Sequence, residues 1–267
     1  MIVFAGITPH PPILIPEIGK DDHKKVRVTY EAMEKLAIDL KRSEPDTIII
    51  ISPHMVHYPH LFNVCGMENL RASFSYFGYE QYSWEGVNNL ELAEEIVDKS
   101  EGEGLPAILY NNEEESYEID HGATVPLSFF DEVLDYQPKI LPIGYSIASR
   151  AEHYTFGQII AEVCEKKTTE RIAVIASGDM SHHLNHSVAG GEEAGREYDK
   201  QMIDLLKKGD DYSIINLDPE MVEKAGECGY RSTLILLGIL SGRDYNADIY
   251  SYEGPFGVGY MVANMRI

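Results

Sequence analysis

The chain has 267 residues, of which 44% are hydrophobic and 25% are charged, a composition typical of globular proteins. A chain of this length buries a sizeable core without disulfide or metal staples, so a bound metal would serve function rather than folding. Lys and Arg total 22 against 44 Asp and Glu, which gives a formal net charge of -22. Such an acidic chain repels phosphate backbones and anionic lipids, so we expect neither nucleic acid nor a membrane surface as its partner.

The cysteines and the N-terminus indicate a reducing compartment. Cys65, Cys164 and Cys228 are odd in number and include no CxxC pair, which argues against a disulfide framework or a zinc finger. The N-terminus has no basic region, and no apolar run approaches the roughly 20 residues of a membrane span. We therefore expect a cytoplasmic protein with a single domain over residues 1–267.

The first part of the chain predicts a strand, a helix and a second strand. Val3–Thr8 is a short apolar run that Pro11 and Pro12 end, and Thr47–Ile51 is a β-branched run. Between them, Lys24–Lys41 has apolar residues at helical spacing. Two buried strands joined by a helix imply a parallel pair with a right-handed crossover.

The rest of the chain mixes expected strands and helices. We expect strands at Leu61–Cys65, Ala72–Phe77, Lys139–Tyr145, Arg171–Ala176, Ala247–Tyr252 and Val258–Met265, and helices at Asn89–Lys99, Val125–Leu134, His153–Lys166, Gly191–Lys208 and Arg231–Leu240. The last two strands have a short connection, which suggests an antiparallel pair. The sequence therefore predicts an α/β fold with a central mixed, largely parallel β-sheet flanked by helices.

Four histidines stand at positions that favour a common site. His10, His54, His121 and His182 each follow an expected strand or lie in a loop before a helix. Ligands of α/β sheets bind outside the carboxyl ends of the strands, so we expect these side chains to converge. His10 and His54 are the predicted metal ligands. The loop histidines His23, His57, His60, His153 and His186 are interpreted as solvated or hydrogen-bonded side chains. The alternative for His57 or His60, three and six residues after His54, is to support the metal ligands, and His183 is expected to point away from His182.

The third ligand is expected at the turn formed by residues 226–229. Iron(II) in oxygen chemistry favours two histidines and one carboxylate, whereas catalytic zinc needs three protein ligands and one open site. Glu227 and Cys228 both satisfy this requirement, and the sequence leaves the choice open. Alternatively, Glu227 merely favours a helix N-terminus and Cys228 packs as a small hydrophobe. Asp120 and Asp179 are suited to orienting a histidine.

Six short motifs occur in a fixed order over essentially the whole chain. They are residues 6–12 (GITPHPP), 52–54 (SPH), 120–127 (DHGATVPL), 177–182 (SGDMSH), 226–229 (GECG) and 252–257 (YEGPFG). Together they resemble the LigB superfamily, which comprises the class III extradiol ring-cleavage dioxygenases and the related Memo-like proteins. This resemblance implies a mixed-sheet α/β fold.

The resemblance also implies a reaction and its residues. A non-haem Fe(II), with zinc or another divalent metal as the alternative, would be held by His10, His54 and Glu227. His182 matches the acid/base histidine, and His121 matches a histidine of the substrate pocket. The implied activity is that of an extradiol dioxygenase, which opens the ring of a small catechol-type aromatic with O2.

A second branch of the superfamily implies a different function. The pair Cys228–Gly229 and the segment 252–257 resemble Memo-like proteins, some of which are encoded with a radical-SAM protein. The implied alternative is a metal-binding protein without ring cleavage, acting through a protein partner or metal redox chemistry. A homodimer is the default expectation for either function. A zinc hydrolase ranks last, because no HExxH motif is present.

Overall fold

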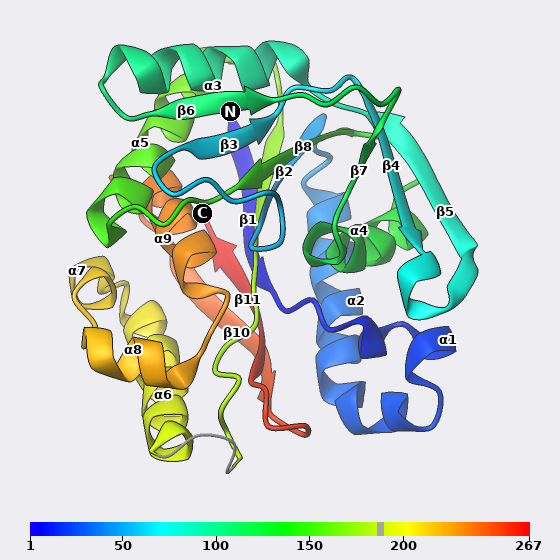
Figure 1. Cartoon of the computed structure of the whole chain (residues 1–267), viewed down its shortest axis with the longest axis vertical. Helices are drawn as coiled ribbons and strands as arrows, with labels where there is room; N and C mark the ends of the chain where they lie inside the picture. Colours follow the sequence, from blue (N-terminus) through cyan, green and yellow to red (C-terminus); the bar gives the residue numbers. More distant parts are fainter. Residues whose placement is uncertain (186–189) are drawn as a thin grey trace.

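An eight-stranded mixed sheet forms the centre of the computed structural model, which describes residues 1–185 and 190–267 (Figure 1). The strand order is β10-β11-β1-β9-β2-β8-β3-β6. The strands are β1 (Ile2–Thr8), β2 (Thr47–Ser52), β3 (Phe62–Cys65), β6 (Ala107–Tyr110), β8 (Lys139–Gly144), β9 (Ile172–Ser177), β10 (Asn246–Glu253) and β11 (Tyr260–Arg266). The predicted α/β class and mixed sheet are confirmed. His186 lies outside the described residues.

The four central strands of this sheet are parallel to one another. β1 pairs with β9, β9 with β2, and β2 with β8, all in parallel. β11 pairs antiparallel with both β1 and β10, as the short connection predicted. β1 and β2 are parallel, as expected, but β9 lies between them. All six residues of β9 are buried, which suits a strand covered on both faces.

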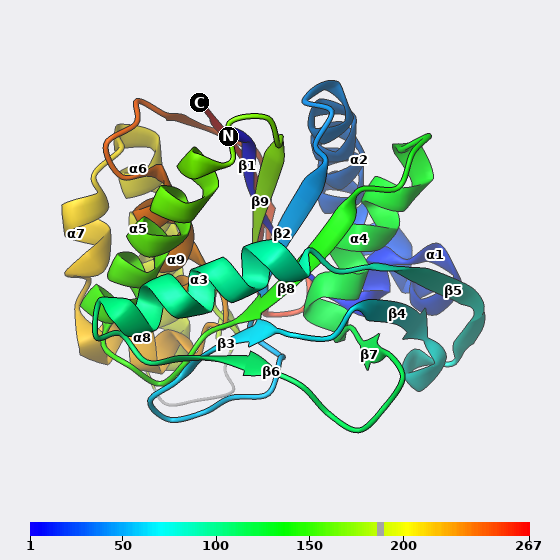
Figure 2. The ribbon, with the colours of Figure 1, turned by 90° about the horizontal axis from the view of Figure 1, so that it is seen from above.

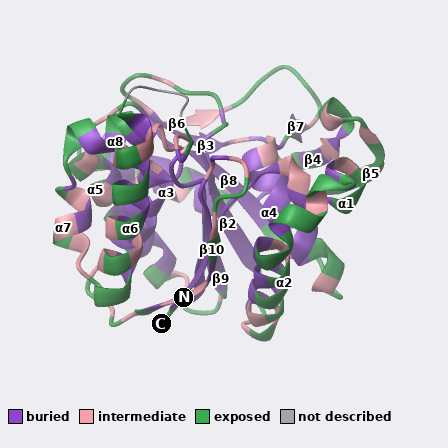
Figure 3. Ribbon diagram, turned by 90° about the horizontal axis from the view of Figure 1, so that it is seen from below, coloured by how far each residue is buried: buried purple, intermediate pink, exposed green. Residues whose placement is uncertain are grey.

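Helices cover both faces of the sheet (Figure 2). On one face lie α2 (Arg27–Arg42) and α4 (His121–Val133), and on the other α3 (Leu90–Gly102), α5 (Arg150–Lys166), α6 (Gly191–Lys208) and α9 (Tyr230–Leu240). Alternate residues of β2 serve the two cores: Ile48 and Ile50 face α2 and α4, and Ile49 and Ile51 face the other layer. In Figure 3 the central strands are coloured as buried, and the outer surfaces of the helices on both sides are coloured as exposed.

Shorter elements complete the fold. The small helices are α1 (Pro16–Gly19), α7 (Asp211–Ile215) and α8 (Pro219–Ala225). A second sheet has the order β5-β4-β7, with β4 (Asn69–Phe74), β5 (Tyr79–Val87) and β7 (Tyr117–Glu118). The sequence did not predict β5, β6 or β7, because β5 is mostly exposed and the other two are very short. Among the described residues, no helix has the length and apolar character needed to cross a membrane.

Helix α4 begins at His121, four residues before the predicted start at Val125. Asp120 caps the helix, because its carboxylate accepts a hydrogen bond of 2.8 Å from the Gly122 N–H. Pro126 lies inside the helix, and a proline at that place argues against a helix running through it. The prediction that His121 lies in a loop is therefore wrong: it occupies the first position of α4.

Candidate metal centre

The carboxyl ends of the four parallel strands meet at one edge of the sheet. Thr8, the last residue of β1, lies opposite Ser177, the last residue of β9. Ser52 ends β2 opposite Gly144, which ends β8. The segments that leave β1, β2 and β9 carry His10, His54 and the stretch 179–182 respectively. The sheet topology thus brings together residues far apart in the sequence.

Three histidines form a group at this edge. The Nε2 atoms of His10 and His54 lie 3.0 Å apart. The His121 ring stacks on His54 with ring centres 4.1 Å apart, and its centre lies 5.4 Å from that of His10. One ligand atom from each of the three lies within 4.8 Å of the others. His10 is buried at 3% exposure, whereas His54 is exposed. The group is therefore anchored in the core and accessible from outside.

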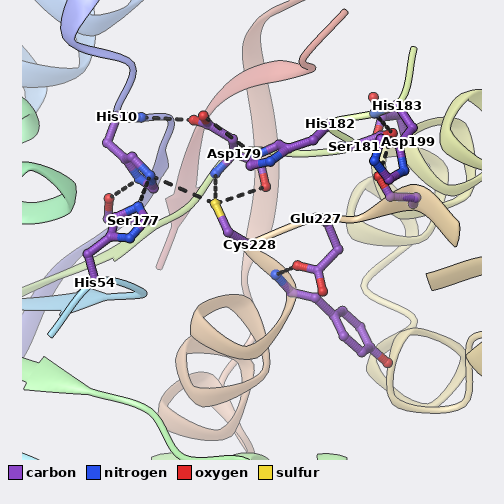
Figure 4. Close-up of polar contacts among 12 residues, drawn as sticks. His10, His54, Ser177, Asp179, Ser181, His182, His183, Asp199, Glu227 and Cys228 are labelled. Atoms are coloured by element: carbon purple, nitrogen blue, oxygen red, sulfur yellow. Dashed lines mark hydrogen bonds and ion pairs between the residues drawn. The ribbon is translucent and has the colours of Figure 1, made fainter. Parts of the chain in front are cut away.

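Cys228 and Asp179 form a second group with His10 (Figure 4). The Cys228 Sγ atom lies 3.8 Å from His10 Nε2, the same nitrogen that faces His54. The Asp179 N–H donates to Cys228 Sγ at 3.2 Å, and the Asp179 carboxylate accepts from the His10 N–H at 3.0 Å. His10 Nε2 thus has an imidazole nitrogen on one side and a thiol sulfur on the other.

Glu227 has a different environment from its neighbour Cys228. Its carboxylate accepts a hydrogen bond of 2.5 Å from the Tyr230 N–H at the start of α9. Figure 4 shows this side chain directed away from His10, His54 and Cys228, and neither group of potential ligands includes it. Burial raises the pKa of Glu227 to about 7. The structure therefore does not bring Glu227 to His10 and His54, and its role as a ligand stays a prediction.

The protonation states at the site suit metal binding. Burial, reinforced by the neighbouring histidines, holds the pKa of His10 well below its usual range and that of His54 at about 4. Both rings are therefore neutral near pH 7, which is the form that binds metals. Burial also raises the pKa of the Cys228 thiol, and a bound cation would deprotonate it. The three imidazoles of His10, His54 and His121, and the set of His10, Asp179 and Cys228, are two donor sets around His10 that fit a divalent metal.

His182, the predicted acid/base residue, lies beside Asp179. Its Nε2 is 3.9 Å from the Asp179 Oδ2 atom and is buried without a hydrogen-bond partner in the described part of the chain. Burial lowers the pKa of His182 and raises that of Asp179 to about 7. An imidazole nitrogen without a protein partner, next to a carboxyl group, is suited to accepting and returning a proton.

Aromatic side chains surround the histidines. The Phe77 ring lies 5.4 Å from that of His121. On another side, His57 stacks on Tyr145 with ring centres 5.0 Å apart, and the Tyr145 hydroxyl donates to the Cys228 carbonyl oxygen at 3.4 Å. The sequence predicts no role for Phe77, and for His57 only the alternative of a residue that supports the metal ligands. The spacing of His57 from His54, three residues, was the only signal that pointed to His57, and none pointed to Phe77.

The fold and these side chains define an α/β protein with a histidine- and cysteine-containing site at the carboxyl ends of its parallel strands. Comparison with known families is more specific. The sequence model for the "catalytic LigB subunit of aromatic ring-opening dioxygenase" matches residues 5–263. The chain therefore belongs to the LigB family, as its motifs predicted.

The chain is also similar to three curated proteins. It is 36% identical over 266 residues to Protein CA_C1420 of Clostridium acetobutylicum, covering 97% of this chain and 56% of that protein. It is 29% identical over 140 residues to a MEMO1 family protein of Methanosarcina barkeri, covering 50% and 47% respectively. It is 22% identical over 296 residues to the 2-aminophenol 1,6-dioxygenase beta subunit of a Pseudomonas species, covering 100% and 94%. The chain thus spans about half the length of the first of these proteins, and the segment matched in the second covers about half of that protein.

A solved structure supports the fold. The uncharacterized protein JW3007 of Escherichia coli K12 superposes with a TM-score of 0.69 over 98% of this chain and 99% of that one. The two sequences are 18% identical, so this likeness concerns the fold alone.

Proposed function

We propose that this chain is a metal-dependent dioxygenase that opens the ring of a catechol-type aromatic with O2. His10 and His54 hold the metal together with a ligand from the turn at 226–229, where Cys228 Sγ lies 3.8 Å from His10 Nε2. The observation that carries the proposal is the position of His10 Nε2, 3.0 Å from His54 Nε2 and 3.8 Å from Cys228 Sγ. The LigB match and the distant likeness to an aromatic dioxygenase subunit support the reaction class. Fe(II) is the proposed metal.

Each side chain at the site has a part in this reaction. Iron, when bound, supplies open positions at which an aromatic substrate and O2 meet and exchange electrons. His182 Nε2 takes the proton of a substrate hydroxyl and later returns it, and Asp179, 3.9 Å away, stabilises the imidazolium. His121, stacked on His54 and next to Phe77, forms the wall against which the substrate ring lies.

Arg231 is placed to bind a substituent on that ring. Its guanidinium carbon lies 5.8 Å from the centre of the Tyr145 ring, while the Tyr145 hydroxyl reaches the Cys228 carbonyl, so a single aromatic ring separates Arg231 from the turn that carries Cys228. The other arginines donate to carboxylate or carbonyl oxygens. Arg231 makes no such hydrogen bond within the described ranges, and the charge that it meets there is that of the Glu227 carboxyl group, whose pKa burial raises and Arg231 partly lowers. In a chain with a net charge of -22, this guanidinium would attract a substrate carboxylate.

The test is anaerobic reconstitution with Fe(II), followed by O2 uptake with a panel of catechols. We expect uptake with at least one catechol, and faster uptake with 3,4-dihydroxybenzoate than with the neutral 3,4-dihydroxybenzamide. Arg231→Gln should abolish this preference, whereas Arg42→Gln, which changes an exposed arginine paired with Asp39, should keep it. No uptake with any catechol, despite stoichiometric iron, would contradict the dioxygenase proposal.

The direction of Glu227 favours a second candidate function. In this structure the Glu227 carboxylate accepts from the Tyr230 N–H at the start of α9, and the thiol of Cys228 faces His10. A thiolate ligand prefers softer ions such as Cu(I) and Zn(II). The second candidate is therefore a Memo-like metal-binding protein without ring cleavage. Tighter binding of Cu(I) or Zn(II) than of Fe(II), together with absent O2 uptake, would favour it over the dioxygenase.

A further inference from the structure

We propose that Ser177 and Pro126 are positioning residues that hold His10 in the tautomer able to bind a metal. His10 Nδ1 lies 3.0 Å from the Ser177 hydroxyl oxygen. The same hydroxyl donates to the carbonyl oxygen of Gly122. A hydroxyl has one proton and a carbonyl oxygen only accepts, so the Ser177 proton is directed at Gly122. Towards His10, Ser177 can therefore only accept, and Nδ1 of His10 must carry the proton.

This arrangement makes His10 Nε2 an acceptor, which in the metal-free chain faces His54 Nε2 as its donor at 3.0 Å. A neutral imidazole has one donor nitrogen and one acceptor nitrogen, and the acceptor is the one that binds a metal. The acceptor of His10 is the atom that faces both His54 Nε2 and Cys228 Sγ. In known metal sites, the other ring nitrogen usually donates to a protein oxygen, which fixes the tautomer and the ring direction. Ser177 supplies that oxygen here.

Pro126 explains why the Gly122 carbonyl is available to Ser177. In an α-helix, the carbonyl of residue i accepts from the N–H of residue i+4. For Gly122 that residue is Pro126, which has no N–H. The carbonyl therefore lacks its helical donor and accepts the Ser177 hydroxyl instead. A proline inside a helix is ordinarily destabilising. Here its missing N–H leaves the Gly122 carbonyl oxygen available to the Ser177 hydroxyl.

The start of α4 is held in place from two strands. A Cβ atom at Gly122 would lie 2.4 Å from the Ser52 hydroxyl oxygen and 3.1 Å from His54 Cδ2, so no larger residue fits without a shift. Ser52, at the end of β2, donates to the Asp120 carboxylate that caps the helix. Ser177, at the end of β9, donates to Gly122. The helix start is thus fixed between β2 and β9, and with it the direction of the Ser177 proton.

The test rests on the proposed metal site but starts from the metal-free full-length chain. Long-range ¹H–¹⁵N NMR spectra show which nitrogen of His10 carries the proton, with its signals assigned by their loss in His10→Gln. We expect the Nδ1–H tautomer in the wild type. Ser177→Ala should shift the population towards Nε2–H and weaken Zn(II) binding about tenfold, measured by competition with a chromogenic chelator. The matched control is Ser100→Ala, which removes an equally buried hydroxyl that donates to the Leu105 carbonyl, remote from the site, and should leave the tautomer of His10 unchanged.

Pro126→Ala restores an N–H that competes with Ser177 for the Gly122 carbonyl. We expect this variant to be more stable than the wild type and yet to show more of the Nε2–H tautomer and weaker Zn(II) binding. A wild type with the Nε2–H tautomer would overturn the proposal, as would an unchanged tautomer and Zn(II) affinity in Ser177→Ala. If the His10 tautomer and the Zn(II) affinity change in Ser177→Ala but stay unchanged in Pro126→Ala, Pro126 has no part in positioning His10. A wild type with Nδ1–H that binds neither Zn(II) nor Fe(II) would contradict the proposed function and leave the tautomer assignment standing.

Discussion

The two ends of the parallel strands use polar groups in opposite ways. At the amino ends, polar groups satisfy one another: the Met1 ammonium group donates to the carbonyl oxygens of Cys164, Lys167 and Glu170. The Glu170 carboxylate in turn accepts from the Thr47 hydroxyl and the Asn89 amide. At the carboxyl ends, two imidazole nitrogens face each other, and His182 Nε2 is buried without a partner in the part of the chain that the structure describes.

This difference separates stability from function within one sheet. A buried polar group that finds a partner contributes to stability, whereas one without a partner costs about 1–3 kcal/mol. The amino ends therefore behave as a structural network. The carboxyl ends keep a buried imidazole nitrogen, Nε2 of His182, without a protein partner among the described residues, which is the pattern expected where a fold gives up stability for a site. Substitutions at the two ends should accordingly change different measured quantities.

The largest effect is expected at His10. His10→Ala removes the nitrogen shared by both groups of potential ligands, so metal content after loading with Fe(II) or Zn(II) and dialysis should fall to background. His10→Ala with full metal content, measured by mass spectrometry, would mean that the site lies elsewhere.

The next effect distinguishes Cys228 from Glu227. Cys228→Ser should weaken Zn(II) binding about 100-fold, because a thiolate ligand is lost. Glu227→Gln keeps the shape of the side chain and an oxygen that accepts from Tyr230, so it should bind Zn(II) like the wild type. If Glu227→Gln weakens Zn(II) binding and Cys228→Ser does not, Glu227 is the third ligand. The turn at 226–229 must then rearrange when the metal binds.

A pH effect is expected from Asp199, which supports the segment after β9. Its carboxylate accepts from the Ser181 N–H at 2.8 Å and from the Tyr252 hydroxyl at 2.6 Å, and burial raises its pKa to about 6. The folded state thus binds this proton more tightly than the unfolded state. Its contribution to the free energy of unfolding, about 2 to 3 kcal/mol, is present below pH 4 and is lost as the pH rises through about 6.

Asp199→Asn should remove this part of the pH dependence, because an amide can make both hydrogen bonds without titrating. Denaturant unfolding of wild type and variant at pH 4.5 and pH 7 measures the difference. An identical slope of stability against pH in the two proteins would show that Asp199 is not responsible for it.

The smallest effect is expected at the amino ends. Glu170→Gln weakens the hydrogen bonds from Thr47 and Asn89, so we expect a loss of about 1 kcal/mol in the free energy of unfolding. Metal affinity should stay at the wild-type value. A Glu170→Gln variant with impaired metal binding would contradict the separation between the two ends of the sheet.

The sequence predicted those features that depend on local pattern. β1, β2 and β9 are continuous apolar runs, and the histidines that follow the first two strands occupy the positions expected for ligands of an α/β sheet. The insertion of β9 between β1 and β2 was not predictable, because strand order depends on contacts between segments far apart in the sequence. The start of α4 was missed because the partner of the Gly122 carbonyl, Ser177, lies 55 residues away.

The choice between Glu227 and Cys228 depends on a similar long-range contact. A Cβ atom at Gly178 would lie 2.0 Å from the Gly229 Cα atom, so the backbones of these two glycines touch. This contact packs the turn at 226–229 against the segment that follows β9. No periodicity or motif in the sequence could supply that information, since adjacent residues on a tight turn point to different sides.

The separation of His10 and Cys228 along the chain has a consequence for the lifetime of the protein. These two residues are 218 positions apart, so an ion bound to both would act as a reversible cross-link between the beginning and the end of the fold. Such an ion binds the native chain and has no preformed site in the unfolded one. The resistance of this protein to unfolding and proteolysis would then follow the concentration of available metal, and scarcity of the ion would shorten its survival.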